Sequence, residues 1–357
     1  MSLIEWVNGD PNKPDQSDVE IHMPYMKEAA SKAGFVLELG AGHGNGSTRA
    51  LSRGLNASSN PDKLMISIDQ WDEKPEEKPP FPWWHELHGD TRSYLVLKHV
   101  QDLSGERKAD VIYIDTDHTY VHLQRELEVW RNLAHPETIW IFHDTWMSGF
   151  YNPMTDAIKE FAAANPPLFY VELSRESHGL GGMRPFVGIN AGSGQRPFPQ
   201  KNGWINMDVQ PLSYEDVVPD MVADMRNMPF PDEYADCVVS HHTLEHLGCG
   251  EADAFIMEAY RVLKPGGKLI IALPDIKALA RRFLLGQISE YIFLVNMMGA
   301  YHGNEADRHK WHYTKDSLTE LLNNNGHWRH TGMWDKESIA DAPIAQDFWI
   351  MIMEARK

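Results

Sequence analysis

The feature that most constrains this chain is an apolar segment that contains an acid and runs directly into alternating glycines. The segment at positions 35–39 includes Glu38, and glycines follow as Gly40, Gly42 and Gly44. An apolar run that breaks into glycines predicts a buried strand entering a tight turn. Glycines have no Cβ, so a ligand can approach the backbone there. The helix expected from Thr48 onward would direct its first N–H groups at that ligand.

A dinucleotide-binding fingerprint is one interpretation of this turn. The pattern G-x-G-x-x-G needs a third glycine at position 45 or 47, where the chain has Asn45 and Ser47. This mismatch disfavours an NAD-dependent oxidoreductase. An ordinary glycine-rich strand-to-helix turn is the other interpretation, and only the residues downstream separate it from a cofactor site.

Short apolar runs alternate with helical periodicity along the following residues, and polar residues close each run. Asp69 ends the run that starts at residue 64, Asp115 ends the next, and His143 and Asp144 follow the run at 138–142. The alternation predicts a parallel sheet flanked by helices. Ligands bind at the carboxyl ends of the strands in such sheets, and an acid ending the second strand binds ribose hydroxyls. Asp69 is therefore expected to bind an adenosine-containing ligand.

These segments together resemble the motifs of class I S-adenosylmethionine (SAM) methyltransferases. The resemblance covers about residues 30–175 and is to the group of macrocin-type sugar O-methyltransferases and cephalosporin-hydroxylase-like proteins. It is carried by Glu38-x-Gly-x-Gly-x-Gly44, Asp69, Gly89-Asp90, Asp115-x-Asp117-His118 and His143-Asp144-Thr145. The resemblance implies that SAM binds to Glu38, Gly40, Gly42, Gly44, Asp69 and Asp90, with Asp90 against the adenine amino group.

Methyl transfer to a hydroxyl requires that the reactants be aligned and that the acceptor lose its proton. Asp115 and Asp144 follow adjacent strands and form a natural pair of oxygen ligands for a hard cation such as Mg²⁺, as in metal-dependent O-methyltransferases that this spacing resembles. The alternative is that Asp115 caps a helix and Asp144 is a solvated loop acid. His118 and His143 are the candidate catalytic bases beside Asp115. His118 has the stronger case because Asp117 adjoins it, and for both a structural role stays open.

A second copy of the architecture begins near residue 186. Its apolar run breaks into glycines at Gly192 and Gly194, and the strand that follows ends in Asp208. Asp224 repeats the position of Asp90. This half resembles predicted SAM-dependent methyltransferases of the broad Methyltransferase-11 type, through Asn190-Ala-Gly-Ser-Gly-x-Arg196, Leu244-Glu245-His246-Leu247 and Arg261-Val-Leu-Lys-Pro-Gly-Gly267. The resemblance implies a second cofactor site at Asn190, Gly192, Gly194, Asp208 and Asp224.

The second copy departs from the first in its glycine turn. Asn190 replaces Glu38, Arg196 replaces Gly44, and the interval from Gly192 to Asp208 is much shorter than the one from Gly40 to Asp69. A three-turn helix at about 1.5 Å per residue hardly fits in that interval, so the first strand–helix unit is expected to be shortened. Either Arg196 replaces the helix N–H groups at the cofactor carboxylate, or this half no longer binds SAM.

A histidine-rich group marks the second half. It consists of His241, His242, Glu245, His246, His302, His309 and His312. The i, i+4 spacing of His241 with Glu245 and of His242 with His246 is compatible with zinc. We interpret the group as a substrate-facing or structural cluster, because the family pattern contains Leu-Glu-His without a known metal.

The fold class expected is α/β, with two tandem Rossmann-like class I methyltransferase domains, each a mostly parallel sheet flanked by helices, at residues 1–184 and 185–357. The 357-residue chain has a formal net charge of −18 and no basic run, which disfavours nucleic acid as a partner. It has no apolar run long enough for a membrane span, and its two cysteines do not form a metal or disulfide pattern, so a cytoplasmic setting is expected. The expected function is SAM-dependent methylation of a sugar or other small hydroxyl acceptor by the first domain. The alternative is one active domain fused to a degenerate module for binding or dimerisation, and a homo-oligomer is compatible with either.

Overall fold

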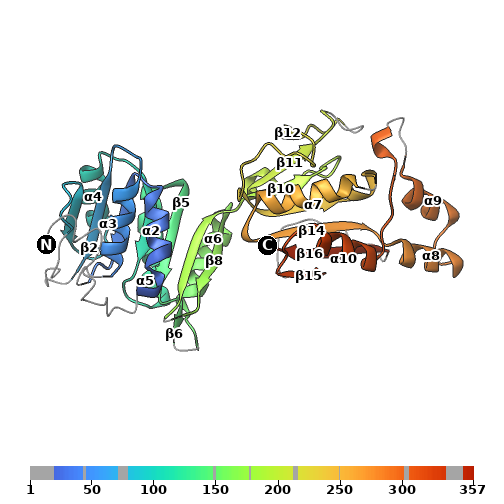
Figure 1. Ribbon diagram of the computed structural model, residues 1–357. Helices are drawn as coiled ribbons and strands as arrows, with labels where there is room; N and C mark the ends of the chain where they lie inside the picture. Colours follow the sequence, from blue (N-terminus) through green and yellow to red (C-terminus); the bar gives the residue numbers. More distant parts are fainter. Residues whose placement is uncertain are drawn as a thin grey trace. The chain divides into compact units, whose positions relative to one another are not determined.

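The computed structural model describes residues 20–42, 46–70, 79–147, 150–176, 178–211, 216–248, 250–300, 305–334 and 349–357. The chain divides into two compact units, Met1–Pro185 and Phe186–Lys357 (Figure 1). The expected division lies one residue earlier. Pro185 closes the last strand of the first unit and therefore belongs to that unit's sheet.

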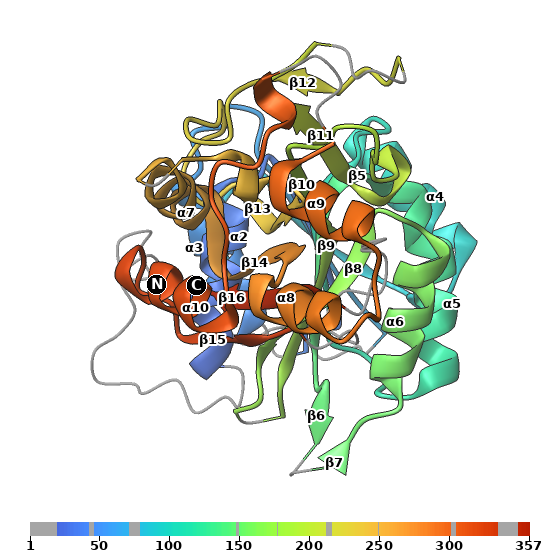
Figure 2. The same ribbon diagram turned by 90° about the vertical axis from the view of Figure 1, so that its right-hand side faces the viewer.

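The first unit is built on a seven-stranded sheet with the order β3-β2-β1-β4-β5-β9-β8. Its strands are β1 (Phe35–Leu39), β2 (Leu64–Asp69), β3 (Trp84–His88), β4 (Ala109–Ile114), β5 (Ala134–His143), β8 (Leu168–Ser174) and β9 (Leu180–Pro185). The strands from β3 to β5 pair in parallel, and β9 pairs antiparallel with both β5 and β8. The short strands β6 (Trp146–Met147) and β7 (Phe150–Tyr151) form a separate hairpin (Figure 2).

Helices cover both faces of this sheet. They are η1 (Glu20–His22), α2 (Met23–Ser31), α3 (Ser47–Ala57), α4 (Tyr94–Ser104), α5 (Tyr120–Trp130), η2 (Arg131–Leu133) and α6 (Met154–Ala164). Side chains alternate between the faces of a strand, and accordingly Val36 packs with α2 and α3, whereas Leu37 packs with α4, α5 and α6. Both faces are buried, which explains the continuous apolar runs in the sequence.

The second unit repeats the sheet in the same order, β12-β11-β10-β13-β14-β16-β15. Its strands are β10 (Gly188–Ala191), β11 (Trp204–Asp208), β12 (Met221–Val222), β13 (Ala235–His241), β14 (Leu263–Pro274), β15 (His330–Met333) and β16 (Ile350–Arg356). Its helices are η3 (Gln200–Asn202), η4 (Leu244–His246), α7 (Glu251–Val262), α8 (Ile276–Leu284), α9 (Glu290–Met298), η5 (Glu305–Asp307) and α10 (Lys315–Asn324). Two mostly parallel sheets with flanking helices confirm the predicted α/β fold class.

On one face of the second sheet, the described residues contain no counterparts of α2 and α3. All residues from 188 to 208 are described, and between β10 and β11 they contain only the three-residue η3. Phe198 and Trp204 pack over this face instead, against Val239 and Ile270. A Cβ on Gly188 would lie 2.4 Å from the Trp204 ring. The glycine on β10 therefore makes room for the tryptophan that replaces helical cover.

In both units an aspartate carboxylate forms hydrogen bonds between the two central strands. The Asp110 carboxylate accepts hydrogen bonds from the N–H groups of Gly34 and Phe35, at 2.7 and 2.8 Å, where β1 begins. Asp236 accepts from the Val187 N–H at 2.9 Å, where β10 begins. Each acid lies near the start of the neighbouring strand, so it fixes the amino ends of the two central strands relative to each other.

Candidate functional site

The first glycine turn lies at the carboxyl end of β1, against the end of β4. Gly40 has φ +84°, and a Cβ there would lie 1.8 Å from the Asp115 carbonyl oxygen. Gly42 has φ +51° and open space where a Cβ would point, and its N–H donates to Asp69 Oδ2 at 2.8 Å. Gly40 is thus required by packing within the protein, whereas Gly42 borders free space. Gly44 lies outside the described residues.

Glu38 lies on β1 just before the glycine turn and is fully buried. Its carboxylate accepts from Ser67 Oγ at 2.6 Å, from Ser47 Oγ at 2.7 Å and from Thr48 Oγ1 at 2.8 Å. Ser47 and Thr48 form the first turn of α3, so Glu38 ties the helix start to β1 and β2. Burial raises the pKa of Glu38 to about 7, although the three hydroxyl groups oppose the rise. Glu38 therefore orients the turn rather than contacting open space.

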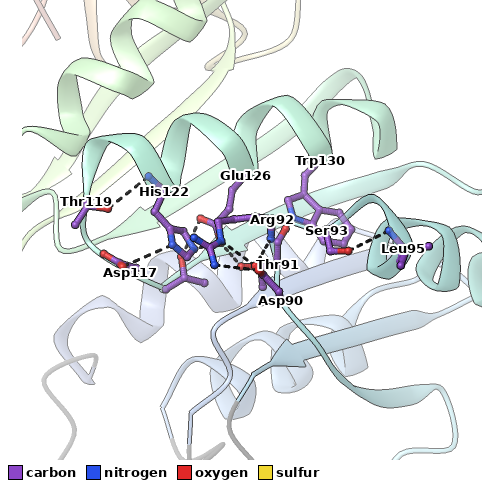
Figure 3. A network of polar contacts seen from close by, with 11 residues as sticks. Asp90, Thr91, Arg92, Ser93, Leu95, Asp117, Thr119, His122, Glu126 and Trp130 are labelled. Carbon is purple, nitrogen blue, oxygen red and sulfur yellow. Dashed lines mark hydrogen bonds and ion pairs between the residues drawn. The ribbon is translucent and has the colours of Figure 1, made fainter.

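Asp90 follows β3 and is bound by Arg92. The Arg92 guanidinium contacts both Asp90 oxygens at 2.9 Å, and the Arg92 N–H also donates to Asp90 Oδ1 (Figure 3). The hydrogen bonds from Arg92 hold the pKa of Asp90 below its usual range. The carboxylate expected to meet an adenine amino group is therefore ionised and fixed in position.

Glu126 on α5, which sequence reasoning missed, connects this loop to the loop after β4. The carboxylate is fully buried and accepts from the hydroxyls of Thr91 and Thr116, the latter at 2.8 Å. His122 Nε2 lies 3.2 Å from Glu126 Oε1 (Figure 3). Trp130 Nε1 donates to the Thr91 carbonyl at 2.7 Å. One helix thus positions the residues that follow both Asp90 and Asp115.

A cluster of acids and histidines lies at the ends of β4 and β5. His118 Nε2 is 2.7 Å from Asp144 Oδ2 and 3.5 Å from Asp115 Oδ1. His143 Nδ1 is 3.0 Å from Asp144 Oδ2, and its ring is almost fully buried. Asp144 has φ +56°, a left-handed conformation that is uncommon for a residue with a side chain. The structure thus brings together all four residues that the sequence proposes for catalysis and metal binding.

Hydrogen bonds within this cluster shift the pKa values of His118 and Asp144 in opposite directions. Hydrogen bonds to Asp115 and Asp144 raise the pKa of His118 to about 10. Burial alone would raise the pKa of Asp144, but hydrogen bonds from His118 and His143 hold that pKa well below its usual range. His118 therefore carries a proton at neutral pH in this arrangement. Ligand atoms of Asp115, His118 and Asp144 lie within 4.8 Å of one another. Because a protonated imidazole has no free lone pair, the two carboxylates are the groups that could hold a divalent cation here.

The second glycine turn repeats these contacts. The Gly194 N–H donates to Asp208 Oδ2 at 2.8 Å, as Gly42 does to Asp69. A Cβ on Gly194 meets open space, whereas one on Gly192 would lie 2.1 Å from the Thr243 side chain. Gly194 is therefore the counterpart of Gly42, and Gly192 that of Gly40, in agreement with the spacing of the sequence. Asp224 is bound by the Arg226 N–H and guanidinium, as Asp90 is by Arg92.

Asn190 takes the place of Glu38 but makes different contacts. Its Nδ2 donates to the Arg196 carbonyl and to Asn206 Oδ1, both at 3.0 Å. Asn206 Oδ1 also accepts from the Phe198 N–H, and its Nδ2 donates to the Phe198 carbonyl. A side chain that both donates and accepts suits a loop, because the loop presents carbonyls as well as N–H groups. Burial lowers the pKa of His241 to about 4, with smaller contributions from the charges of His242 and of the exposed Arg196 side chain.

A pocket of about 510 Å³ opens beside the second turn. Its lining includes four of the five residues predicted for the second cofactor site, Gly192, Gly194, Asp208 and Asp224, whereas the fifth, Asn190, is buried outside the lining. His242 and His246 lie on its wall, so part of the histidine-rich group faces it. Within the described residues, no helix is long and apolar enough to cross a membrane.

Comparison with known proteins agrees with this geometry. Residues 37–145 match one family model described as a methyltransferase domain, and residues 201–271 match another with the same description. The first match includes the glycine turn and the strands β2 to β5. The second match begins after the glycine turn of its unit and includes β11, β12, β13 and most of β14. The chain therefore carries two class I methyltransferase domains in tandem, as the sequence predicted.

Curated relatives match only over short segments. The chain is 40% identical over 89 residues to the 25S rRNA (adenine(645)-N(1))-methyltransferase of Saccharomyces cerevisiae, which is 25% of this chain and 21% of that protein. It is 29% identical over 93 residues to the ubiquinone/menaquinone biosynthesis C-methyltransferase UbiE of Vibrio cholerae, covering 25% of this chain and 33% of that protein. The chain thus spans a third or less of the length of these relatives.

Solved structures with a similar fold include an O-methyltransferase from Bacillus cereus in complex with S-adenosylhomocysteine (SAH). It is 19% identical, with a TM-score of 0.34, and the match covers 51% of this chain and 90% of that one. A TDP-rhamnose 3′-O-methyltransferase of calicheamicin biosynthesis is 13% identical, with a TM-score of 0.35 and coverage of 51% and 91%.

Proposed function

We propose that the first unit binds SAM and transfers its methyl group to the oxygen of a small hydroxylated acceptor, with a sugar as the favoured class. The observation that carries this proposal is the position of the acid–histidine cluster. Asp115 contacts the glycine turn directly through its carbonyl, beside Gly40, and its carboxylate belongs to the cluster with His118 and Asp144. A cofactor on the turn and an acceptor on the cluster would therefore meet at one edge of the sheet.

The cofactor would be held by groups at or just after the carboxyl ends of the strands β1, β2 and β3. Asp69, fixed by the Gly42 N–H, would accept hydrogen bonds from the ribose hydroxyls. Asp90, fixed by Arg92, would face the adenine amino group. The N-terminus of α3 would lie near the carboxylate of the methionine part, where N–H groups and the helix dipole favour an anion.

The acceptor hydroxyl would lose its proton to solvent water at the cluster. Asp115 and Asp144 would hold Mg²⁺, and such a cation lowers the pKa of a hydroxyl that it binds. His118 contacts both carboxylates and would shape the acceptor side of the site. His143 is buried behind Asp144, so we assign it the role of positioning that carboxylate.

The second unit has a different place in this proposal. Its pocket and its Asp208 and Asp224 contacts support cofactor binding, but it lacks the helix that would bind the methionine carboxylate. We propose that it binds SAM more weakly than the first unit. The alternative function is a degenerate module for binding or dimerisation, which the replacement of Glu38 by Asn190 favours.

The test combines binding and turnover in the full chain. Calorimetry with SAH should show one tight site that Asp69→Ala weakens by at least about tenfold, a loss of about 1.4 kcal/mol. The matched variant Asp208→Ala should affect only a weaker second phase. Two equally tight sites, or tight binding lost only in Asp208→Ala, would refute the assignment of the units.

Turnover is tested by screening hydroxylated small molecules and sugars with methyl-labelled SAM. Asp144→Asn should abolish product formation while leaving SAH affinity within about twofold, because Asp144 contributes to the acceptor side. Loss of activity in EDTA and its recovery with Mg²⁺ would support the cation. Full activity after exhaustive EDTA treatment would contradict it, and an Asp144→Asn variant with unchanged turnover would refute the cluster as the catalytic site.

A further inference from the structure

Three side chains of the second unit converge beside its pocket. Glu245 and His246 belong to η4, and His309 follows η5. One ligand atom from each of the three lies within 4.8 Å of the others. Glu245 is only 1% exposed, and His246 lines the pocket. The group therefore joins a buried carboxylate to two imidazoles, one of which lines the pocket.

Backbone carbonyls fix the tautomers of both histidines. His246 Nδ1 lies 3.1 Å from the Arg308 carbonyl, and His309 Nδ1 lies 2.8 Å from the Asn296 carbonyl. A carbonyl oxygen only accepts, so each Nδ1 carries the hydrogen and each neutral ring keeps its lone pair on Nε2. Metal-ligating histidines use this arrangement, in which the second ring N–H donates to a carbonyl or carboxylate and fixes the ring.

Glu245 has one oxygen that the protein leaves unused. Its Oε1 lies 3.2 Å from His242 Nδ1, whereas its Oε2 is buried and has no hydrogen-bond partner among the described residues. The Glu245 carbonyl accepts the N–H groups of Lys310 and Trp311, which holds the segment containing His309 against η4. A buried carboxylate oxygen without a partner costs free energy, and a bound cation would remove that cost.

We propose that Glu245, His246 and His309 form a zinc site. Two imidazole nitrogens and one carboxylate oxygen suit Zn²⁺, whereas Mg²⁺ and Ca²⁺ prefer oxygen ligands throughout. Three protein ligands leave a fourth position open, as in zinc sites that bind water or a ligand. Because His246 lines the pocket, that position would take a water or an oxygen atom of a pocket ligand. The site does not depend on the proposed methyl transfer.

The experiment uses the full chain carrying Asp144→Asn, so that the cluster in the first unit is disabled as a competing metal site. The protein is stripped with a chelator, dialysed and titrated with Co²⁺, whose visible absorption reports coordination by nitrogen and oxygen ligands. We expect one bound Co²⁺ per chain that a stoichiometric amount of Zn²⁺ displaces. Glu245→Gln and His309→Ala should each weaken binding by at least about 100-fold, since even outer-shell changes cost 10–100-fold.

A neighbouring histidine provides the matched control. The His312 ring lies 6.2 Å from the His309 ring and outside the proposed ligand set, so His312→Ala should leave Co²⁺ affinity unchanged. His246→Ala, at a partly exposed position, provides a third ligand variant if Glu245→Gln unfolds, with circular dichroism as the check of folding. No Co²⁺ binding by the starting protein would overturn the proposal. Equal affinity in the folded ligand variants, or a loss in His312→Ala as large as theirs, would also overturn it.

Discussion

Glu38→Gln tests how the first glycine turn is held. In the folded chain the Glu38 carboxyl is fully buried among three hydroxyl groups, and burial raises its pKa from the usual 4.5 to about 7. Glutamine has the same shape and stays neutral at every pH. The second unit carries an amide, Asn190, at the same position of its sheet, so that unit serves as an internal reference.

The direction of the pH dependence of stability follows from whether the folded or the unfolded chain binds the Glu38 proton more tightly. Between about pH 4.5 and 7 the folded chain retains the Glu38 proton and the unfolded chain has lost it, so the unfolding free energy falls as the pH rises. The contribution of Glu38 is fully present below pH 4.5 and is lost as the pH passes through 7. At about 1.4 kcal/mol per pKa unit, wild type should lose about 2.5 kcal/mol relative to Glu38→Gln between about pH 5 and pH 8.

Hydrogen exchange in increasing denaturant, read by mass spectrometry, measures this difference in each unit separately. Peptides from β1 and β2 should give an unfolding free energy that falls with pH in wild type and falls less in Glu38→Gln. Peptides from β10 and β11 should respond equally in both proteins. A difference between wild type and variant that stays constant from about pH 5 to pH 8 would show that Glu38 is already ionised in the folded chain, and would refute the reasoning.

Two further predictions concern the residues around the turn. Gly40→Ala should lower the unfolding free energy of the first unit by more than about 2 kcal/mol, because the new Cβ would overlap the Asp115 carbonyl. In the control Gly42→Ala the Cβ meets open space, so that variant should lose only about 1 kcal/mol for its positive φ. Equal losses in denaturant titrations would contradict the packing argument. Glu126→Gln should cost about 1–3 kcal/mol and speed amide exchange around Thr91 and Thr116, because their hydroxyls lose a charged acceptor. The exposed Glu128→Gln on the same helix should do neither, and indistinguishable exchange in the two variants would exclude Glu126 as the link between the loops.

The sequence was sufficient to predict the architecture because parallel sheets impose simple patterns. Strands buried on both faces appear as apolar runs, and their carboxyl ends share one edge, so Asp69, Asp115 and Asp144 were expected at that edge. The duplication was visible because the predicted strands of the second half follow one another in the same order as those of the first half. The contact between His118 and Asp144 was not predictable in detail, since it depends on the backbone at Asp144, which has a positive φ.

Other features depend on contacts between distant residues, which no local pattern reveals. Glu126 has no motif around it, and its role follows from hydroxyls that lie on two other loops. Gly192 packs against the Thr243 side chain, which comes from the end of another strand, whereas Gly194 borders open space. Sequence spacing alone matched the glycines in order but did not show which of them borders open space.

The two units show how a methyltransferase sheet accommodates the loss of a helix. In the first, α3 offers hydroxyl donors at its start, and a carboxylate that only accepts, Glu38, binds them. In the second, a loop replaces the helix and offers a carbonyl, so an amide is needed at the same strand position.

The second unit also differs on the sheet face that corresponds to the one covered by α2 and α3 in the first unit. Trp204 pairs with Gly188 in the register where Met65 pairs with Val36, so a larger side chain on one strand is matched by the loss of a side chain on its neighbour. Asn190 thus replaces the polar contacts of the lost helix, and the pair of Trp204 with Gly188 replaces its apolar cover. Loss of the helix without these changes would have removed two of the three hydroxyl donors of the buried carboxylate and would have left an apolar face uncovered.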